Sequence, residues 1–111
     1  MRRLALIAAL ALVATGAVAQ SLNVVGKWAA SHERCEAGEL IEFAADGSFK
    51  STLDENEPRE GQYKTGRDRI ILLDAAEPDR ELALIVIDFS PNRLVAFDET
   101  IESDRRLMRC R

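Results

Sequence analysis

The sequence predicts an all-β protein, a small antiparallel up-and-down barrel of about eight strands. A short run of apolar or alternating residues followed by turn-forming residues recurs about every 8 to 12 positions along residues 20–111, a spacing typical of all-β domains. The connections are short, whereas a crossover between parallel strands needs about a dozen residues or more. Consecutive strands are therefore expected to be antiparallel neighbours, which is the arrangement of an up-and-down barrel.

A segment with the features of a signal peptide precedes this domain. Met1-Arg2-Arg3 is a positively charged start, residues 4–14 are an unbroken apolar run, and Ala17-Val18-Ala19 has the small residues of a cleavage site. A transmembrane anchor would need about 20 apolar residues. We therefore expect cleavage after Ala19, leaving a mature domain that is periplasmic or secreted and has no membrane attachment.

Removal of residues 1–19 leaves 92 of the 111 residues, which is enough for one domain. The cut also takes away Arg2 and Arg3, so that the formal net charge changes from −4 to −6. An acidic domain offers no broad basic surface to an anionic partner. Binding to nucleic acid or to an anionic membrane is therefore disfavoured.

The first strands are expected at residues 27–31, 39–44 and 48–53. A two-residue turn at Asp46 and Gly47 would place Phe43 opposite Lys50 and put a charge on the buried side. A loop that begins one residue earlier, with Gly47 in the left-handed conformation, pairs Phe43 with Phe49 instead. We therefore predict a three-residue loop with Asp46 and Gly47 as turn residues.

The remaining strands are expected at residues 60–65, 69–73, 81–89, 93–97 and 105–110. Acidic loops that contain Pro58 and Pro78 precede the fourth and sixth strands. Ser90 to Arg93 carries Pro91 where a type I turn favours proline, so it should reverse the chain between the sixth and seventh strands.

The sixth strand is apolar on both faces, although a barrel strand needs only one apolar face. Leu82, Leu84 and Val86 are expected to face one way, and the opposite face then consists of Ala83, Ile85, Ile87 and Phe89. Two explanations are open for that second face. Either residues 22–25 or a loop cover it, or it is an interaction surface for a protein partner or a second copy.

Both cysteines, Cys35 and Cys110, lie in the mature domain, and an even count in a small exported protein indicates a disulfide. Metal ligands or reactive thiols are the alternative, but neither cysteine belongs to a group of Cys and His residues with metal-ligand spacing. A bridge would constrain residues 35–110, for which chain entropy predicts a stabilisation of about 4.5 kcal/mol. It requires either a chain excursion between residues 31 and 39 that returns toward Cys110, or a different strand count.

Several motifs resemble the small lipocalin-like (calycin-type) domains of exported bacterial proteins over roughly residues 24–109. They are Gly26-Lys27-Trp28, the Phe43-x-x-Asp46-Gly47-Ser48-Phe49 hairpin, and Glu60-Gly61-Gln62-Tyr63 before residues 69–72. The resemblance implies that Gly26 and Trp28 close one end of the barrel and that Arg106 or Arg109 packs across the indole. The chain is far shorter than a full lipocalin and has no counterpart of the loop that covers the cup.

The interior of such a short barrel can be filled by side chains or can hold one small hydrophobic ligand. The expected inward-facing residues are Ile41, Phe43, Phe49, Leu53, Tyr63, Ile71, Leu84, Val86, Val95 and Phe97.

Catalytic and metal-binding motifs are missing from the sequence. The one histidine, His32, lies in a polar connection, and we find no nucleophile elbow, no metal-ligand spacing and no phosphate-binding glycine loop. Residues 54–57 carry three carboxylates and an asparagine, but without the regular spacing of a calcium loop. We therefore expect a protein that is not an enzyme and holds no cofactor or metal.

Two functions remain open at this point. The first is a lipocalin-like barrel that binds a small hydrophobic ligand. The second is an inhibitor or protein-binding module that acts on an exported protease or lysozyme, for which an acidic surface would suit a basic target. An inhibitor that inserts its N-terminal arm would leave residues 20–25 exposed, whereas a barrel plug would bury them. The sequence does not decide the oligomeric state.

Overall fold

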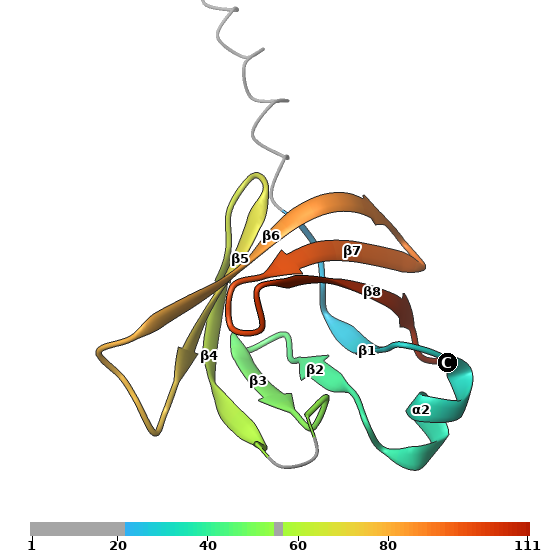
Figure 1. Cartoon of the computed structure of the whole chain (residues 1–111), viewed down its shortest axis with the longest axis horizontal. Helices are drawn as coiled ribbons and strands as arrows, with labels where there is room; N and C mark the ends of the chain where they lie inside the picture. The colour runs from blue at the N-terminus through green and yellow to red at the C-terminus, as the bar shows by residue number, and fades with distance from the viewer. Residues whose placement is uncertain (1–21, 55–56) are drawn as a thin grey trace, which may run out of the picture.

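The computed structural model describes residues 22–54 and 57–111, which form a closed barrel of eight antiparallel strands (Figure 1). Each strand pairs with the next in sequence, and the last pairs with the first, so the predicted fold class is confirmed. The expected signal peptide lies outside the described residues. The strands are β1 (Gly26–Ala29), β2 (Ile41–Phe43), β3 (Ser48–Ser51), β4 (Arg59–Thr65), β5 (Arg69–Asp74), β6 (Glu81–Ser90), β7 (Arg93–Asp98) and β8 (Ser103–Arg109).

The hairpin between β2 and β3 has the predicted register. Phe43 lies opposite Phe49, and both side chains are buried, while Glu42 lies opposite Lys50. Gly47 has a φ of 93°, a left-handed conformation that glycine adopts without steric cost. The Asp46 carboxylate accepts a hydrogen bond from the backbone N–H of Ser48 over 2.9 Å, which fixes the turn.

The connection between β1 and β2 contains a short helix, α2 (His32–Ala37), that the sequence analysis did not predict. Ser31 caps its start by accepting a hydrogen bond from the N–H of Arg34, and Gly38 ends it in the left-handed conformation. The helix carries Cys35 back to the end of β8, where the Cα atoms of Cys35 and Cys110 are 5.8 Å apart in a disulfide. The bridge is therefore accommodated by a chain excursion and not by a different strand count. Figure 1 shows α2 beside the C-terminus.

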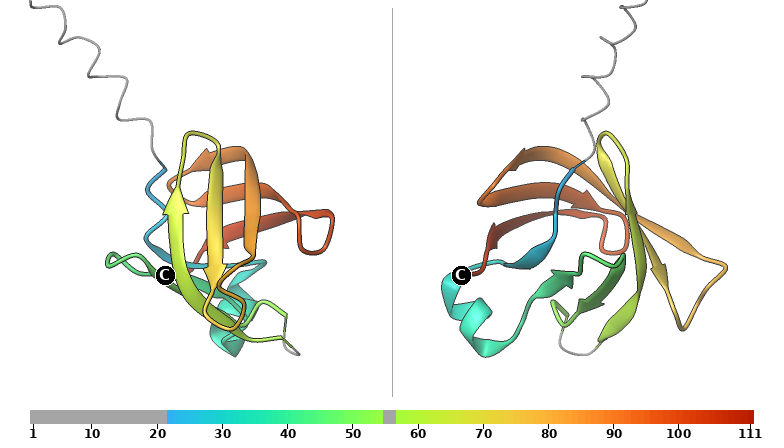
Figure 2. Two further views of the ribbon diagram at one scale, coloured as in Figure 1. Left: turned by 90° about the vertical axis from the view of Figure 1, so that its left-hand side faces the viewer. Right: turned by 180° about the vertical axis from the view of Figure 1, so that it is seen from behind.

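The core lies inside the barrel, but three residues expected there are at outward-facing positions. Figure 2 shows β4, β5 and β6 side by side. Ile70 lies opposite Leu84 in the core, so Ile71 faces outward, and the prediction for Ile71 is wrong. The same alternation along β7 places Leu94 and Ala96 in the core cluster and directs Phe97, and Val95 at 5% exposed, to the other side of the strand. Both faces of these strands carry apolar residues, so only the pairing register decides which face is turned to the core.

A β-bulge changes the orientation of side chains near the end of β6. Val86 lies opposite Ala96, yet Asp88 lies opposite Val95, so Ile87 is an extra residue in β6. Beyond the bulge, Phe89 faces inward, packs against the core and lies 6.1 Å from Trp28 between ring centroids. The expectation that Phe89 belongs to the outward face of β6 is therefore wrong.

Candidate functional site: the two barrel ends and the outer face

One end of the barrel is closed around Trp28, which is fully buried. Its indole Nε1 donates a hydrogen bond to the carbonyl oxygen of Val24 over 2.9 Å, and the Arg109 guanidinium lies over the ring, 4.3 Å from its centroid. Val24 belongs to the core cluster and Leu22 packs against it. The segment from residue 22 to 25 therefore plugs this end of the barrel.

Arg109 supplies the basic group that covers Trp28. It also donates hydrogen bonds to the backbone carbonyls of Val25 and Pro91, which fastens the N-terminal segment to β8. Glycine is favoured at position 26 because its φ of 136° is strained for other residues, and a Cβ there would also approach Nη1 of Arg109 to 2.5 Å.

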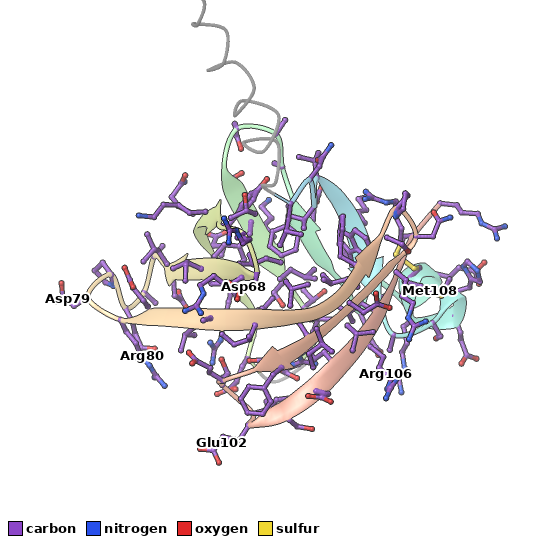
Figure 3. All side chains as sticks on the ribbon, turned by 90° about the horizontal axis from the view of Figure 1, so that it is seen from above. Asp68, Asp79, Arg80, Glu102, Arg106 and Met108 are labelled. Carbon is purple, nitrogen blue, oxygen red and sulfur yellow. A yellow bond between two sulfur atoms is a disulfide. The ribbon has the colours of Figure 1, made fainter. Side chains whose placement is uncertain are left out.

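Arg106 does not take part in this closure. It lies opposite Val95 on the outer side of β8 and is exposed, so it cannot reach the indole. The assignment of Arg106 to the barrel closure is therefore wrong, because the alternation of β8 sends Arg106 and Arg109 to opposite faces. Figure 3 shows Arg106 projecting away from the barrel.

The opposite end of the barrel carries a partly buried ion-pair cluster that was not predicted from the sequence. Nε of Arg105 donates to the Asp98 carboxylate over 2.7 Å, and Nη2 donates to Asp54 over 3.0 Å. Nearby, Nε of Arg59 lies 4.0 Å from the Asp74 carboxylate. The signal that could have revealed this cluster is the alternation of β8, which places Arg105 on the same face as Leu107.

The hydrogen bonds of this cluster also decide the protonation of Arg105. Desolvation lowers the pKa of Arg105, but hydrogen bonds and charge interactions with Asp98 and Asp54 outweigh it and raise that pKa overall. The arginine therefore stays charged, and its two carboxylate partners neutralise it inside the barrel mouth.

The interior between these two ends is nearly filled. A pocket at the mouth, partly open to solvent, has a volume of about 30 Å³, with Ile41, Phe49 and Leu84 among its lining residues. This is about the volume of one water molecule. Sites for drug-sized ligands usually have volumes of about 300–1,000 Å³.

Two of the carboxylates considered for a calcium loop lie among the described residues, and each of them contacts an arginine. Asp54 bonds to Arg105, and Glu57 lies 3.8 Å from Arg59. Glu55 and Asn56 lie outside the described residues. Within residues 22–54 and 57–111, no cluster of three or more potential metal ligands occurs.

The outer face of β6 and β7 carries an apolar patch, which we call the outer patch and define as Ile85, Ile87 and Phe97. Ile87 is 59% exposed and Phe97 is 36% exposed, and Ile85 lies opposite Phe97. Residues 22–25 do not cover this face, because they pack at the Trp28 end of the core. The outer patch is therefore open to a partner.

Ala83, also expected on this surface, is only 8% exposed. Its backbone N–H donates to the Glu99 carboxylate over 3.2 Å, and its carbonyl accepts from the Glu99 N–H over the same distance. Glu99 thus lies against Ala83, which contributes little to the surface.

His32, the one histidine of the chain, is exposed at the start of α2. No helix in the part of the chain that the structure describes is long and apolar enough to cross a membrane. Comparison of the chain with protein-family models, with curated proteins and with solved structures found no match.

Proposed function

We propose that this chain is an exported, non-enzymatic, lipocalin-like (calycin-type) binding protein whose partner is another protein. The observation that carries the proposal is the outer patch, where Ile87 and Phe97 expose apolar surface on a rigid barrel wall. Large apolar patches exposed on a small domain mark interaction sites, and the pairing of Ile85 with Phe97 extends the apolar surface across two strands. The closed antiparallel barrel is compatible with the lipocalin-like assignment.

The filled interior favours a protein partner over a small hydrophobic guest. A guest inside the barrel would have to displace core side chains such as Phe49 and Leu84 from a cavity of about 30 Å³. A partner on the outer patch displaces only solvent. The proposal therefore takes up the protein-binding alternative of the sequence analysis.

The N-terminal segment argues against one mode of inhibition. Val24 is 1% exposed and accepts the indole hydrogen bond of Trp28, so withdrawing this segment into a partner would open the barrel end. A partner would instead meet the barrel wall. The acidic net charge suits a basic target such as a lysozyme.

The charged groups in the mouth support a structural role and not a catalytic one. Arg105 is shared between Asp98 and Asp54, and Arg59 lies beside Asp74. Each of these carboxylates lies beside an arginine side chain, as expected for groups that hold the barrel mouth together.

The test uses the oxidised mature domain, residues 20–111, in titrations against a lysozyme and a set of secreted serine and metalloproteases. We expect inhibition or binding of at least one target, with affinity reduced at least tenfold by Ile87→Lys. Val25→Lys is the matched control, because Val25 is an apolar residue that is 41% exposed in the N-terminal segment and does not belong to the outer patch. Its affinity should equal that of the unchanged domain.

Two results would overturn the proposal. One is the absence of binding to every target, together with saturable, one-to-one binding of a fatty acid, which would favour the interior-ligand function. The other is a target affinity that Ile87→Lys and Val25→Lys leave equally intact.

A further inference from the structure

The first half of β8 is an unpaired edge of an otherwise closed barrel. β8 pairs with β7 from Ser103 to Met108, but with β1 only at Met108 and Arg109. β1 ends at Ala29, and the chain then turns into α2. Within the described chain, residues 103–107 therefore have no strand on the side of β1, as Figure 1 shows.

The backbone groups that face this open side can be identified from the ladder. Successive residues of an antiparallel strand direct their N–H and C=O groups alternately to the two neighbouring strands. Arg109 donates to the carbonyl of Asn92 on the side of β7, and Cys110 donates to the carbonyl of Lys27 on the side of β1. The alternation directs the backbone groups of Arg106 and Asp104 to the open side. Unpaired strand edges of this kind are templates for an added strand.

A groove of about 360 Å³ runs along this edge, between β8 and residues 30–39. Leu53, Ile101 and Leu107 provide apolar surface in it. The far wall is formed by the ion pair between Arg34 and Glu39. A groove of this size is too small for a folded domain but suits a short extended segment.

The free edge continues the outer patch. Across the outer surface, Ile85 lies opposite Phe97, and Phe97 lies opposite Asp104 on β8. A protein that covers the outer patch therefore meets the edge of β8 at its border.

The outer side chains of the edge define the charge of a complementary segment. Neither Asp104 nor Arg106 forms an ion pair with another described residue, and they alternate on the same face of β8. Opposite charges placed directly across a strand pair stabilise it, and like charges destabilise it. An added antiparallel strand would thus carry an acidic residue opposite Arg106 and a basic residue two positions later, opposite Asp104.

We propose that the free edge of β8 is a peptide-binding site, which takes an extended segment of a partner protein as an added antiparallel strand of pattern acidic–apolar–basic. The apolar residue, opposite Arg105, faces inward over Leu53 and Leu107. The segment continues the path that β1 leaves at Ala29. This inference rests on the proposed function, since it names the segment by which the partner is recognised.

The experiment uses the oxidised mature domain and a capped peptide, Thr-Val-Glu-Val-Lys-Val-Thr, with the charge-swapped peptide Thr-Val-Lys-Val-Glu-Val-Thr as its control. We expect titration calorimetry to show at least tenfold tighter binding of the first peptide. The double variant D104R/R106E should reverse that preference, while Lys64→Glu on β4 should leave it unchanged. The amide hydrogens of Asp104 and Arg106 should become protected from exchange when the first peptide is bound.

The inference is overturned if both peptides bind equally or not at all, if the double variant does not reverse the preference, or if protection appears away from β8. Binding of a protein target by the variants distinguishes failure of the strand-addition site from failure of the proposed function. If Ile87→Lys abolishes target binding and D104R/R106E does not alter it, the outer patch is retained as the binding surface and the strand-addition site is rejected.

Discussion

Nε of Arg105 donates to Oδ2 of Asp98 over 2.7 Å, and this pair joins the last two strands inside the barrel mouth. Both side chains are largely buried, at 15% and 10% exposed. The same guanidinium bonds to Asp54, 51 positions earlier in the chain. One arginine thus links β8 to β7 and to the segment that follows β3.

Replacing Arg105 should therefore destabilise the domain strongly. We expect Arg105→Met to reduce the free energy of unfolding by about 2–4 kcal/mol, because Asp98 would be left buried without its counter-charge. Urea titration of the oxidised domain measures this loss.

The matched control is Arg93→Met, which removes an exposed ion pair with Asp88. Exposed pairs contribute about 0–1 kcal/mol, so this variant should remain close to the unchanged domain. Adding Asp98→Asn to Arg105→Met should recover part of the loss. Equal stabilities of the two single variants would show that the buried pair has no special role.

The mouth cluster shows where the sequence could and could not predict the structure. The strand count and the β2–β3 register follow from alternation and turn residues. The spacing of two residues between Arg105 and the apolar Leu107 indicates that Arg105, and not its neighbour Arg106, faces inward. Asp54, the partner of Arg105, comes from a distant loop, and only the folded barrel brings it there.

A second prediction separates the two arginines that the resemblance allowed as partners of Trp28. Arg109→Ala should reduce the free energy of unfolding by about 1–2 kcal/mol, because a cation that covers a buried indole and two backbone hydrogen bonds are lost. Arg106→Ala should change it by less than about 0.5 kcal/mol. Trp28 is the one tryptophan, so its fluorescence reports the change directly. Equal effects of the two substitutions would contradict the geometry.

A third prediction concerns the turn between β2 and β3. Gly47→Ala should cost about 1–2 kcal/mol, since a Cβ is disfavoured at a φ of 93°. Gly66→Ala is the control, because a Cβ there would meet the Arg69 side chain at an ordinary 3.6 Å. Thermal unfolding compares the two, and an unchanged midpoint for Gly47→Ala would count against the register.

Helix α2 and the inward faces of β5 and β7 were not predicted correctly, and the reasons are physical. α2 has no buried residue, so hydrophobic periodicity gives no helical signal, and its disulfide holds it to β8. In β5, Ile70 and Ile71 are equally apolar neighbours, and in β7 Leu94 and Val95 are likewise. Pairing across the sheet, which is a property of the whole barrel, decides which of each pair is inside.

The last prediction concerns alkaline stability and Tyr63. Burial, and secondly the charge of Asp46, raise the pKa of Tyr63 above its ordinary value of 10.0. The folded protein therefore holds the phenolic proton more tightly than the unfolded chain does. This contribution to stability is complete below pH 10 and is lost as the pH rises through the raised pKa.

Tyr63 is the one tyrosine, so tyrosinate absorbance follows its titration alone. The folded domain should titrate at a higher pH than the same domain in urea. Tyr63→Phe should remove this alkaline dependence and, because the hydrogen bond from Oη to the Ala44 carbonyl is lost, cost about 1 kcal/mol near neutral pH. If the folded and the unfolded chain titrate at the same pH, the coupling is refuted. A higher titration pH for the folded chain would support a raised pKa of Tyr63, whose ring packs against Phe43.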